Sequence, residues 1–268
     1  MKQVLSVQDL SCLGKCSMTV TLPVLSAMGC SCTALPTAVL STHTGFPKPH
    51  VRSLTEDILP ICRHWQENGA RFDAAQVGYL SDPEQVSAVE TVLDAFDGLK
   101  VIDPVLGDRG KLYSRMTADH VEAMKRLCRK GNILLPNVTE AAMLTGVPYM
   151  ENADRDYYHR LLTKLMEFGA EAVIVTGVSL EPGAVGFMGM DKKSGVFSFQ
   201  CATVPNESHG TGDLFAAVFT GAMMRHGDVS KAAWLAASFV ERVLTKSPGT
   251  TKFGLEFENQ LPWLWEQL

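Results

Sequence analysis

Residues 209–219 have the sequence His-Gly-Thr-Gly-Asp-Leu-Phe-Ala-Ala-Val-Phe. The two glycines beside Thr211 allow the backbone to turn tightly and to point successive N–H groups into one concavity, and the apolar residues that follow have helical spacing. The segment therefore predicts an anion-binding nest at a helix N-terminus, where unpaired N–H groups and the helix dipole favour negative charge. Asp213 is either a cap in the first helical turn or a base that takes a proton from a substrate hydroxyl, and the local sequence leaves both interpretations open.

Outward from this segment, the chain alternates between strand-like and helix-like stretches. We expect strands at Val4–Val7, Thr33–Leu40, Phe72–Tyr79, Lys100–Val105, Asn132–Pro136, Ala172–Gly177, Gly183–Met190 and Gly195–Val204. We expect helices at Met18–Met28, Val51–Asn68, from Ser81, Thr117–Lys130, from Asn137, Arg155–Phe168 and at the C-terminal end. Repeated βα units of this length predict an α/β fold in which helices cover both faces of a mainly parallel central sheet, with ligands beyond the carboxyl ends of the strands. No linker or low-complexity tract interrupts the chain, so residues 1–268 are expected to form a single domain.

Composition excludes several classes of partner. The net charge is −5 and the chain has no basic stripe, which argues against nucleic acid. We find no uninterrupted run of 18 apolar residues and no signal peptide at the N-terminus, so no membrane partner is predicted and the expected location is cytoplasmic.

The chain has seven cysteines without repeated spacing. An odd number in a long chain without a secretion signal indicates free thiols. A zinc site formed by Cys12, Cys16, Cys30 and Cys32 is a weaker alternative, because these residues fall in a strand-like run or just before a helix.

Two further stretches place acids at strand ends. Asp103-Pro104-Val105-Leu106-Gly107-Asp108 carries two carboxylates five residues apart, and Asn137-Val138-Thr139-Glu140 places an amide and an acid at the start of a helix. Carboxylates in such positions hold Mg²⁺ or its waters. As alternatives, the two aspartates are ordinary turn residues and Glu140 is a helix cap.

These three motifs occur here in the order found in pyridoxal kinases, and the chain resembles that family over nearly its whole length. Other matching stretches are Val4–Gln8, His43-Thr44-Gly45-Phe46 and Val77-Gly78-Tyr79. The resemblance implies a three-layer α/β/α ribokinase-like fold, ATP as co-substrate, a B6 vitamer as substrate, Mg²⁺, and a homodimer. No P-loop and no protein-kinase glycine-rich loop is present, so phosphate handling is expected to depend on the nest and the metal-binding acids.

Carried over by position, the resemblance assigns roles to individual residues. Asp213 is expected to be the base, with Gly210, Thr211 and Gly212 as the anion hole; Asp103 and Glu140 are expected to bind magnesium; Asp108, Asn137 and Thr176 are expected near the ATP phosphates; and Thr44 and Tyr79 are expected to line the vitamer pocket. His43 and His209 flank this site, and we expect them to form structural hydrogen bonds rather than to act in the chemistry.

The chain departs from the family at three places. Asp9 stands where many members have a serine against the ring, and it either faces the pocket, turns toward solvent or caps the loop before Ser11. The stretch between Asp108 and Tyr113 is short. Leu135 stands where some relatives place a threonine that binds a monovalent cation. The resemblance therefore leaves open whether the activity depends on K⁺.

The expected activity is ATP-dependent phosphorylation of the 5′-hydroxymethyl group of pyridoxal or another B6 vitamer. A hydroxymethylpyrimidine kinase of the same superfamily is the closest alternative, although those enzymes commonly carry cysteine where this chain has Asp213. A sugar kinase fits the Asp103–Asp108 segment less well. A B6-binding protein without turnover is the alternative from another class, and it would not need a base at an anion hole.

Overall fold

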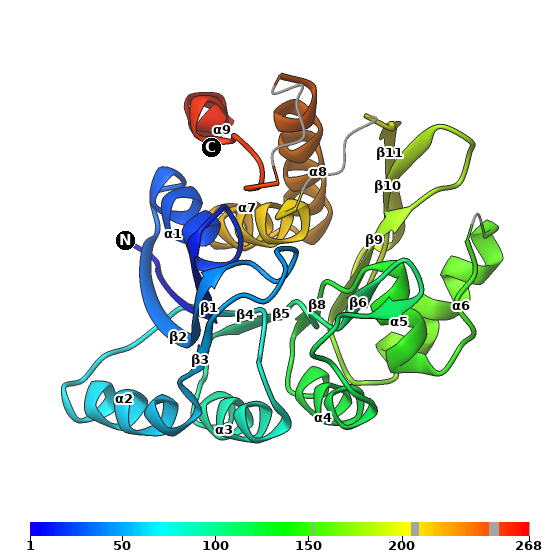
Figure 1. Ribbon diagram of the computed structural model, residues 1–268. Helices are drawn as coiled ribbons and strands as arrows, with labels where there is room; N and C mark the ends of the chain where they lie inside the picture. The colour runs from blue at the N-terminus through cyan, green and yellow to red at the C-terminus, as the bar shows by residue number, and fades with distance from the viewer. Residues whose placement is uncertain (152, 205–208, 247–251, 268) are drawn as a thin grey trace.

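The computed structural model describes residues 1–151, 153–204, 209–246 and 252–267, and within these ranges its centre is a nine-stranded sheet (Figure 1). The strand order is β11-β10-β9-β8-β5-β4-β1-β2-β3. The strands are β1 (Gln3–Leu13), β2 (Ser31–Thr42), β3 (Val51–Ser53), β4 (Ala74–Val77), β5 (Leu99–Ile102), β8 (Ile133–Leu134), β9 (Ala172–Val178), β10 (Ala184–Asp191) and β11 (Gly195–Ala202). The central strands from β2 to β9 pair in parallel, whereas β3, β10 and β11 join antiparallel at the two edges. The prediction of a mainly parallel sheet is confirmed.

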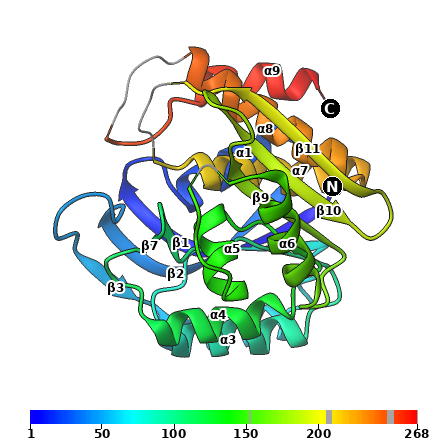
Figure 2. The same cartoon turned by 90° about the vertical axis from the view of Figure 1, so that its right-hand side faces the viewer.

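Helices cover both faces of this sheet (Figures 1 and 2). One layer consists of α2 (Thr55–Glu67), α3 (Pro83–Asp94), α4 (Ala118–Cys128), α5 (Val138–Thr145) and α6 (Arg155–Met166), and the other of α1 (Met18–Ala27), α7 (Thr211–His226), α8 (Val229–Lys246) and α9 (Leu261–Glu266), which follows the short 3₁₀ helix η1 (Glu258–Gln260). Each layer encloses its own cluster of buried apolar side chains against the sheet. In the described part of the chain, no helix is both long enough and apolar enough to cross a bilayer.

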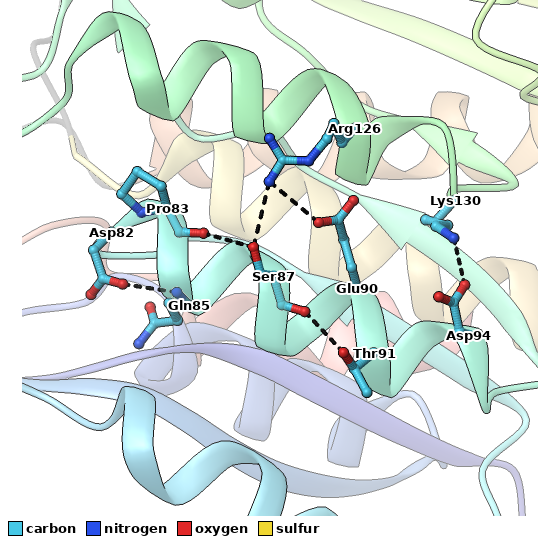
Figure 3. A network of polar contacts seen from close by, with 9 residues as sticks. All are labelled: Asp82, Pro83, Gln85, Ser87, Glu90, Thr91, Asp94, Arg126 and Lys130. Carbon is cyan, nitrogen blue, oxygen red and sulfur yellow. Dashed lines mark hydrogen bonds and ion pairs between the residues drawn. The ribbon is translucent and has the colours of Figure 1, made fainter.

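Polar contacts hold α3 against α4 on the outer surface of the first layer (Figure 3). The guanidinium of Arg126 donates to Ser87 and pairs with Glu90 at 3.5 Å, and the ammonium of Lys130 pairs with Asp94 at 2.6 Å. Pairs this exposed stabilise a protein by about 0–1 kcal/mol each. The apolar cluster beneath the helices is therefore the main source of stability in this layer.

Capping residues fix where the helices begin beyond the strand ends. The carboxylate of Asp82 accepts a hydrogen bond from the amide of Gln85 at 2.8 Å, and Pro83 occupies the first helical position of α3. Asn137 caps α5 in the same way through the amide of Glu140 at 2.9 Å. These caps satisfy N–H groups that a helix cannot bond internally, so the sequence predicted both starts correctly.

The structure differs from the predicted elements at three places. The predicted helix Val51–Asn68 begins only at Thr55, because residues 51–53 pair antiparallel with β2 as the edge strand β3. β1 extends to Leu13 rather than ending at Val7, since it pairs with β2 over that length. A small hairpin of β6 (Gly107–Asp108) and β7 (Lys111–Leu112) was not predicted, and it folds the short Asp108–Tyr113 stretch back on itself.

Candidate active site

A cleft of about 640 Å³ opens at the carboxyl ends of the parallel strands. Every site residue predicted from the sequence lines it: Asp9, Thr44, Tyr79, Asp103, Asp108, Asn137, Glu140, Thr176, Gly210, Thr211, Gly212 and Asp213. They come from strand ends and helix starts that are far apart in the chain. A parallel sheet brings such positions to one edge, which explains why they meet.

The glycine nest forms at the N-terminus of α7, as predicted. Gly210 is the N-cap residue and has φ of 87°, a left-handed conformation that favours glycine. A Cβ atom at Gly210 would also collide with the backbone carbonyl of Lys15. A Cβ atom on Gly212 would lie 3.9 Å from Oδ2 of Asp103, so the nest and that carboxylate border the same space.

Asp213 lies in the first turn of α7, and its carboxylate faces the backbone amide of Ser17 near the start of α1. Burial raises the pKa of Asp213 to about 6, the Ser17 amide lowers it, and the charge of Asp9 raises it. A carboxylate whose pKa lies near neutrality is well matched to accept a proton at physiological pH. This arrangement favours the base over the simple cap.

Asp103 follows β5 and Glu140 lies in the first turn of α5. The amide of Leu106 donates to Oε1 of Glu140 at 3.1 Å, and the amide of Asn137 donates to Oε2 at 2.8 Å. With the reciprocal bond from the Glu140 amide, this is a capping box, so the capping interpretation of Glu140 is confirmed. The same carboxylate also lines the cleft, and its oxygens keep lone pairs beyond those that the amides of Leu106 and Asn137 occupy.

Ionising these two acids is unfavourable in the absence of a cation. Burial, together with the charges of Glu140 and Asp213, raises the pKa of Asp103, and burial raises the pKa of Glu140 to about 8. The ion pairs within the described residues involve neither carboxylate. A buried carboxylate beside a half-buried one suits a hard divalent cation, which prefers oxygen ligands.

Asp108, Asn137 and Thr176 form the next part of the wall. The side-chain amide of Asn137 donates to the carbonyl of Gly107 at 2.8 Å and thereby joins the β6–β7 hairpin to α5. Asn137 and Thr176 also form a parallel bridge. Asp108 is more exposed, with 58% of its side chain accessible, so it lies at the mouth of the cleft.

Asp9 is 4% exposed, so the interpretation that it turns toward solvent is wrong. Its Oδ2 accepts a hydrogen bond from Ser11 at 2.9 Å, and burial raises its pKa. The register of β1 and β2 shifts at this point, because Gln8 pairs with Pro36 whereas Leu10 pairs with Val39. β2 therefore has one extra residue opposite Asp9, a β-bulge of the kind that redirects side chains beside functional sites.

The same bulge helps to place Tyr79. The hydroxyl of Thr37, a residue of the bulge, donates to the carbonyl of Tyr79 at 2.9 Å. The carbonyl of Thr37 accepts from the amide of Leu54 at 2.9 Å and from the side chain of Gln85 at 2.7 Å. The end of β4 is thus fixed to β2 and α3, and Tyr79 is buried where the cleft begins.

Several residues of the cleft were not predicted. Ser17 has φ of 52° without being glycine, an unfavourable conformation that concentrates at functional sites. Cys16 and Tyr113 lie nearby, and one end of the cleft is apolar, lined by Val185, Phe187, Phe199, Val240 and Leu244. The residues of β10, β11 and α8 match ordinary core patterns, so no sequence signal separates them from packing positions.

The seven cysteines are all free, as predicted. Among the described residues, no group of three or more histidine, cysteine, aspartate or glutamate side chains is arranged to hold a metal ion. The zinc alternative for Cys12, Cys16, Cys30 and Cys32 therefore gains no support. Burial, with the charges of Asp213 and Asp9, raises the pKa of Cys16, so its sulfur in the cleft is a neutral thiol.

A profile of the family described as phosphomethylpyrimidine kinase matches residues 20–255. The chain belongs to the phosphomethylpyrimidine kinase family. The match includes the three motifs that carry the resemblance, from Asp103 to Asp213.

The structure of pyridoxal kinase from Lactobacillus plantarum is 31% identical, with a TM-score of 0.92, and the alignment covers 100% of this chain and 98% of that one. A Bacteroides thetaiotaomicron protein with the same family description, crystallised with pyridoxal, is 33% identical with a TM-score of 0.93 and coverage of 98% and 95%. The pyridoxine/pyridoxal/pyridoxamine kinase of Bordetella bronchiseptica is 28% identical over 91% of this chain and 89% of its own. The resemblance to pyridoxal kinases of the ribokinase superfamily and the three-layer fold are thereby confirmed.

Proposed function

We propose that this protein transfers the γ-phosphoryl group of ATP to the 5′-hydroxymethyl group of pyridoxal or another B6 vitamer. The observation that carries the proposal is Asp213, a half-buried carboxylate with a pKa of about 6 that lies beside the glycine nest in one cleft. A base next to an anion hole is the arrangement that phosphoryl transfer to an alcohol needs. A protein that only stores a vitamer would not need it.

In the proposed mechanism, the vitamer lies between Asp9, Thr44 and Tyr79, and its hydroxyl points to Asp213. Asp213 accepts the hydroxyl proton as the oxygen attacks the γ-phosphorus and the bond to ADP breaks. The amides of residues 210–212 donate to the phosphoryl oxygens and stabilise their negative charge. Asp108, Asn137 and Thr176 then lie along the phosphates, and the apolar end of the cleft has the character to accept the nucleotide base.

The pair Asp103 and Glu140 fits a magnesium site, because ionising both carboxylates is unfavourable without a cation. We propose that these two residues hold Mg²⁺ directly or through its waters, since magnesium takes only one or two carboxylates. When bound, the ion neutralises charge on the phosphates. Glu140 keeps its capping role at the same time.

Release of ADP tests the proposal. The protein is incubated with ATP, Mg²⁺ and, separately, pyridoxal, pyridoxine, pyridoxamine and hydroxymethylpyrimidine. ADP release with a B6 vitamer supports the proposal, whereas release with hydroxymethylpyrimidine alone supports the second candidate, which the family description favours. Equilibrium vitamer binding without ADP release would identify a binding protein instead.

Two expectations from the family resemblance belong to the same proposal. Leu135 is buried in the cleft and its side chain offers no oxygen ligand, so the assay is run with and without K⁺. The homodimer is tested by sedimentation equilibrium of the purified protein.

Asp103→Asn and Glu140→Gln should each raise the Mg²⁺ concentration required for half-maximal activity, and they should change vitamer binding less. Both variants keep the shape of the side chain, and glutamine at position 140 can still serve in the capping box. The check is a magnesium titration of ADP release beside a binding titration with vitamer. Unchanged magnesium dependence in both variants would remove this pair from the metal site.

Asp9→Ser should change the relative kcat/KM among the three vitamers, because an ionised carboxylate only accepts hydrogen bonds whereas serine also donates. A phenolic hydroxyl or a protonated pyridine nitrogen on the ligand would supply the proton that Asp9 needs. Asp9→Ala should mainly weaken vitamer binding and leave ATP binding unchanged. We would measure kcat/KM for the three vitamers across pH in wild type and in both variants. If the pH profiles are parallel and the ratios of kcat/KM among the vitamers are unchanged, Asp9 does not touch the substrate.

A further inference from the structure

His43 lies just beyond the end of β2, directly before Thr44, and is 5% exposed. Both of its ring nitrogens are engaged. The amide of Gly45 donates to Nδ1 at 3.2 Å, and Nε2 lies 2.7 Å from the carbonyl oxygen of Lys252, which only accepts. The ring is therefore neutral, with its proton on Nε2.

The His43 ring also contacts segments that are distant from each other in the sequence. Its centroid lies 4.6 Å from that of His209, the residue before the glycine nest, and 4.8 Å from that of Phe46. Gly45 packs so closely on His209 that an added Cβ would lie 2.7 Å from the ring of His209. The vitamer side of the cleft and the start of the nest therefore meet at His43.

The segment that receives the Nε2 bond is itself fixed to the nest. The amide of Lys15 donates to the carbonyl of Phe253 at 2.6 Å, and Lys15 and Gly254 form a parallel bridge. The carbonyl of Lys15 is the group that closely approaches Gly210. A contiguous path thus runs from the Gly45 amide, through the His43 ring and residues 252–254, to Lys15 and the start of the nest at Gly210.

We propose that His43 is a positioning residue for the phosphoryl transfer: its neutral ring fastens the Thr44 loop to residues 252–254 and sets the vitamer against the glycine nest. This inference rests on the proposed function. His43 does not touch the reacting atoms. Its two hydrogen bonds act on Gly45, the residue after Thr44, and on Lys252, and the imidazole ring sets the separation of these two backbone groups.

Acid should weaken this fastening. A proton on Nδ1 would oppose the N–H of Gly45, so the bond at 3.2 Å would be lost. The titratable and charged groups that face the ring are His209 and Lys252, whose ammonium lies 5.6 Å from the Phe46 ring centroid, and neither supplies a negative charge that would stabilise the imidazolium. Burial lowers the pKa of His43, in agreement with a ring that stays neutral.

Two variants separate the two hydrogen bonds. Asparagine at position 43 can replace the Nδ1 acceptor, and glutamine can replace the Nε2 donor. Loss of one hydrogen bond should raise the vitamer KM by about 2- to 12-fold in His43→Asn and in His43→Gln. His43→Ala loses both bonds and should raise it by roughly tenfold or more, with the KM for ATP changed by less than about twofold. His50→Gln is the control, because His50 is exposed, follows the same loop and lies outside the cleft.

A second measurement needs no substrate. Long-range ¹H–¹⁵N spectra of the full-length protein, with the His43 signal assigned by comparison with His43→Gln, should show a proton on Nε2 and none on Nδ1 at neutral pH, with a pKa below that of an ordinary histidine. A proton on Nδ1, or titration at an ordinary histidine pKa, would overturn the proposal. Equal changes of the KM values for vitamer and ATP in the variants would overturn it as well. If the wild type releases no ADP with any vitamer, the proposed function fails, whereas the spectra still decide whether His43 fastens the loop.

Discussion

Replacing Asp213 with asparagine should reduce kcat by roughly 10²–10⁴-fold while the protein stays folded. Asparagine has nearly the same shape and can accept hydrogen bonds, so the contact with the amide of Ser17 is kept. It cannot take a proton from the substrate hydroxyl. The measurement is steady-state ADP release with a saturating vitamer, with the circular dichroism spectrum and Tm recorded for the same sample.

The pH profile gives a second view of the same residue. Only the ionised carboxylate is a base, and burial places its pKa at about 6. The kcat/KM of the wild type should therefore be full above that pH and fall about tenfold per pH unit below it. Asp228→Asn is the matched control, because Asp228 caps the neighbouring helix α8 through the amide of Lys231 and lies outside the cleft. Near-normal kcat in Asp213→Asn would show that the base is another group.

Gly210→Ala should lower kcat by roughly 10²–10³-fold, comparable to removing a donor from an oxyanion hole. The new methyl group would collide with the carbonyl of Lys15, which is backbone and cannot rotate away. The amides of the nest must then shift from the phosphoryl oxygens. The left-handed conformation of residue 210 adds a conformational cost of about 1–2 kcal/mol.

Gly227→Ala separates these two effects, because Gly227 caps the other end of α7 with φ of 64° and an added Cβ there meets no atom within 4 Å. Gly227→Ala should lose stability in urea or thermal unfolding through the same conformational cost of a left-handed residue, but it should keep its kcat. If Gly210→Ala retains kcat while losing stability to the same extent as Gly227→Ala, the nest does not bind the transferred group.

Local chemistry explains which parts of the fold and site could be predicted. The starts of α3 and α5 depend on side chains three residues apart, and the nest depends on glycines beside Thr211, so both are visible in a short window of sequence. Asp103 could be placed at a strand end because the apolar strand residues directly before it lie in the same short window of sequence. The parallel sheet then brings these windows together without further information.

Other features depend on contacts between distant segments. The pairing of Val51–Ser53 with β2 overrode a helical pattern, because edge pairing is decided by the neighbouring strand. The strained backbone of Ser17 and the apolar lining near Phe187 have no local signature. Glu140 shows a different limit, since cap and metal ligand were treated as alternatives although one carboxylate has lone pairs enough for both.

The β-bulge opposite Asp9 bears on how this family can diversify. Aspartate is disfavoured inside a strand, yet here the regular pairing of β1 with β2 is already interrupted, and Pro36 could not donate a ladder bond in any case. A change of residue 9 therefore breaks no regular pairing of β1 with β2, although Asp9 is nearly as buried as Val7 and its carboxylate accepts a hydrogen bond from Ser11. Single mutations at position 9 can thus explore new ligand preferences without breaking the pairing of β1 with β2, and their cost to folding is the loss of the buried contact with Ser11.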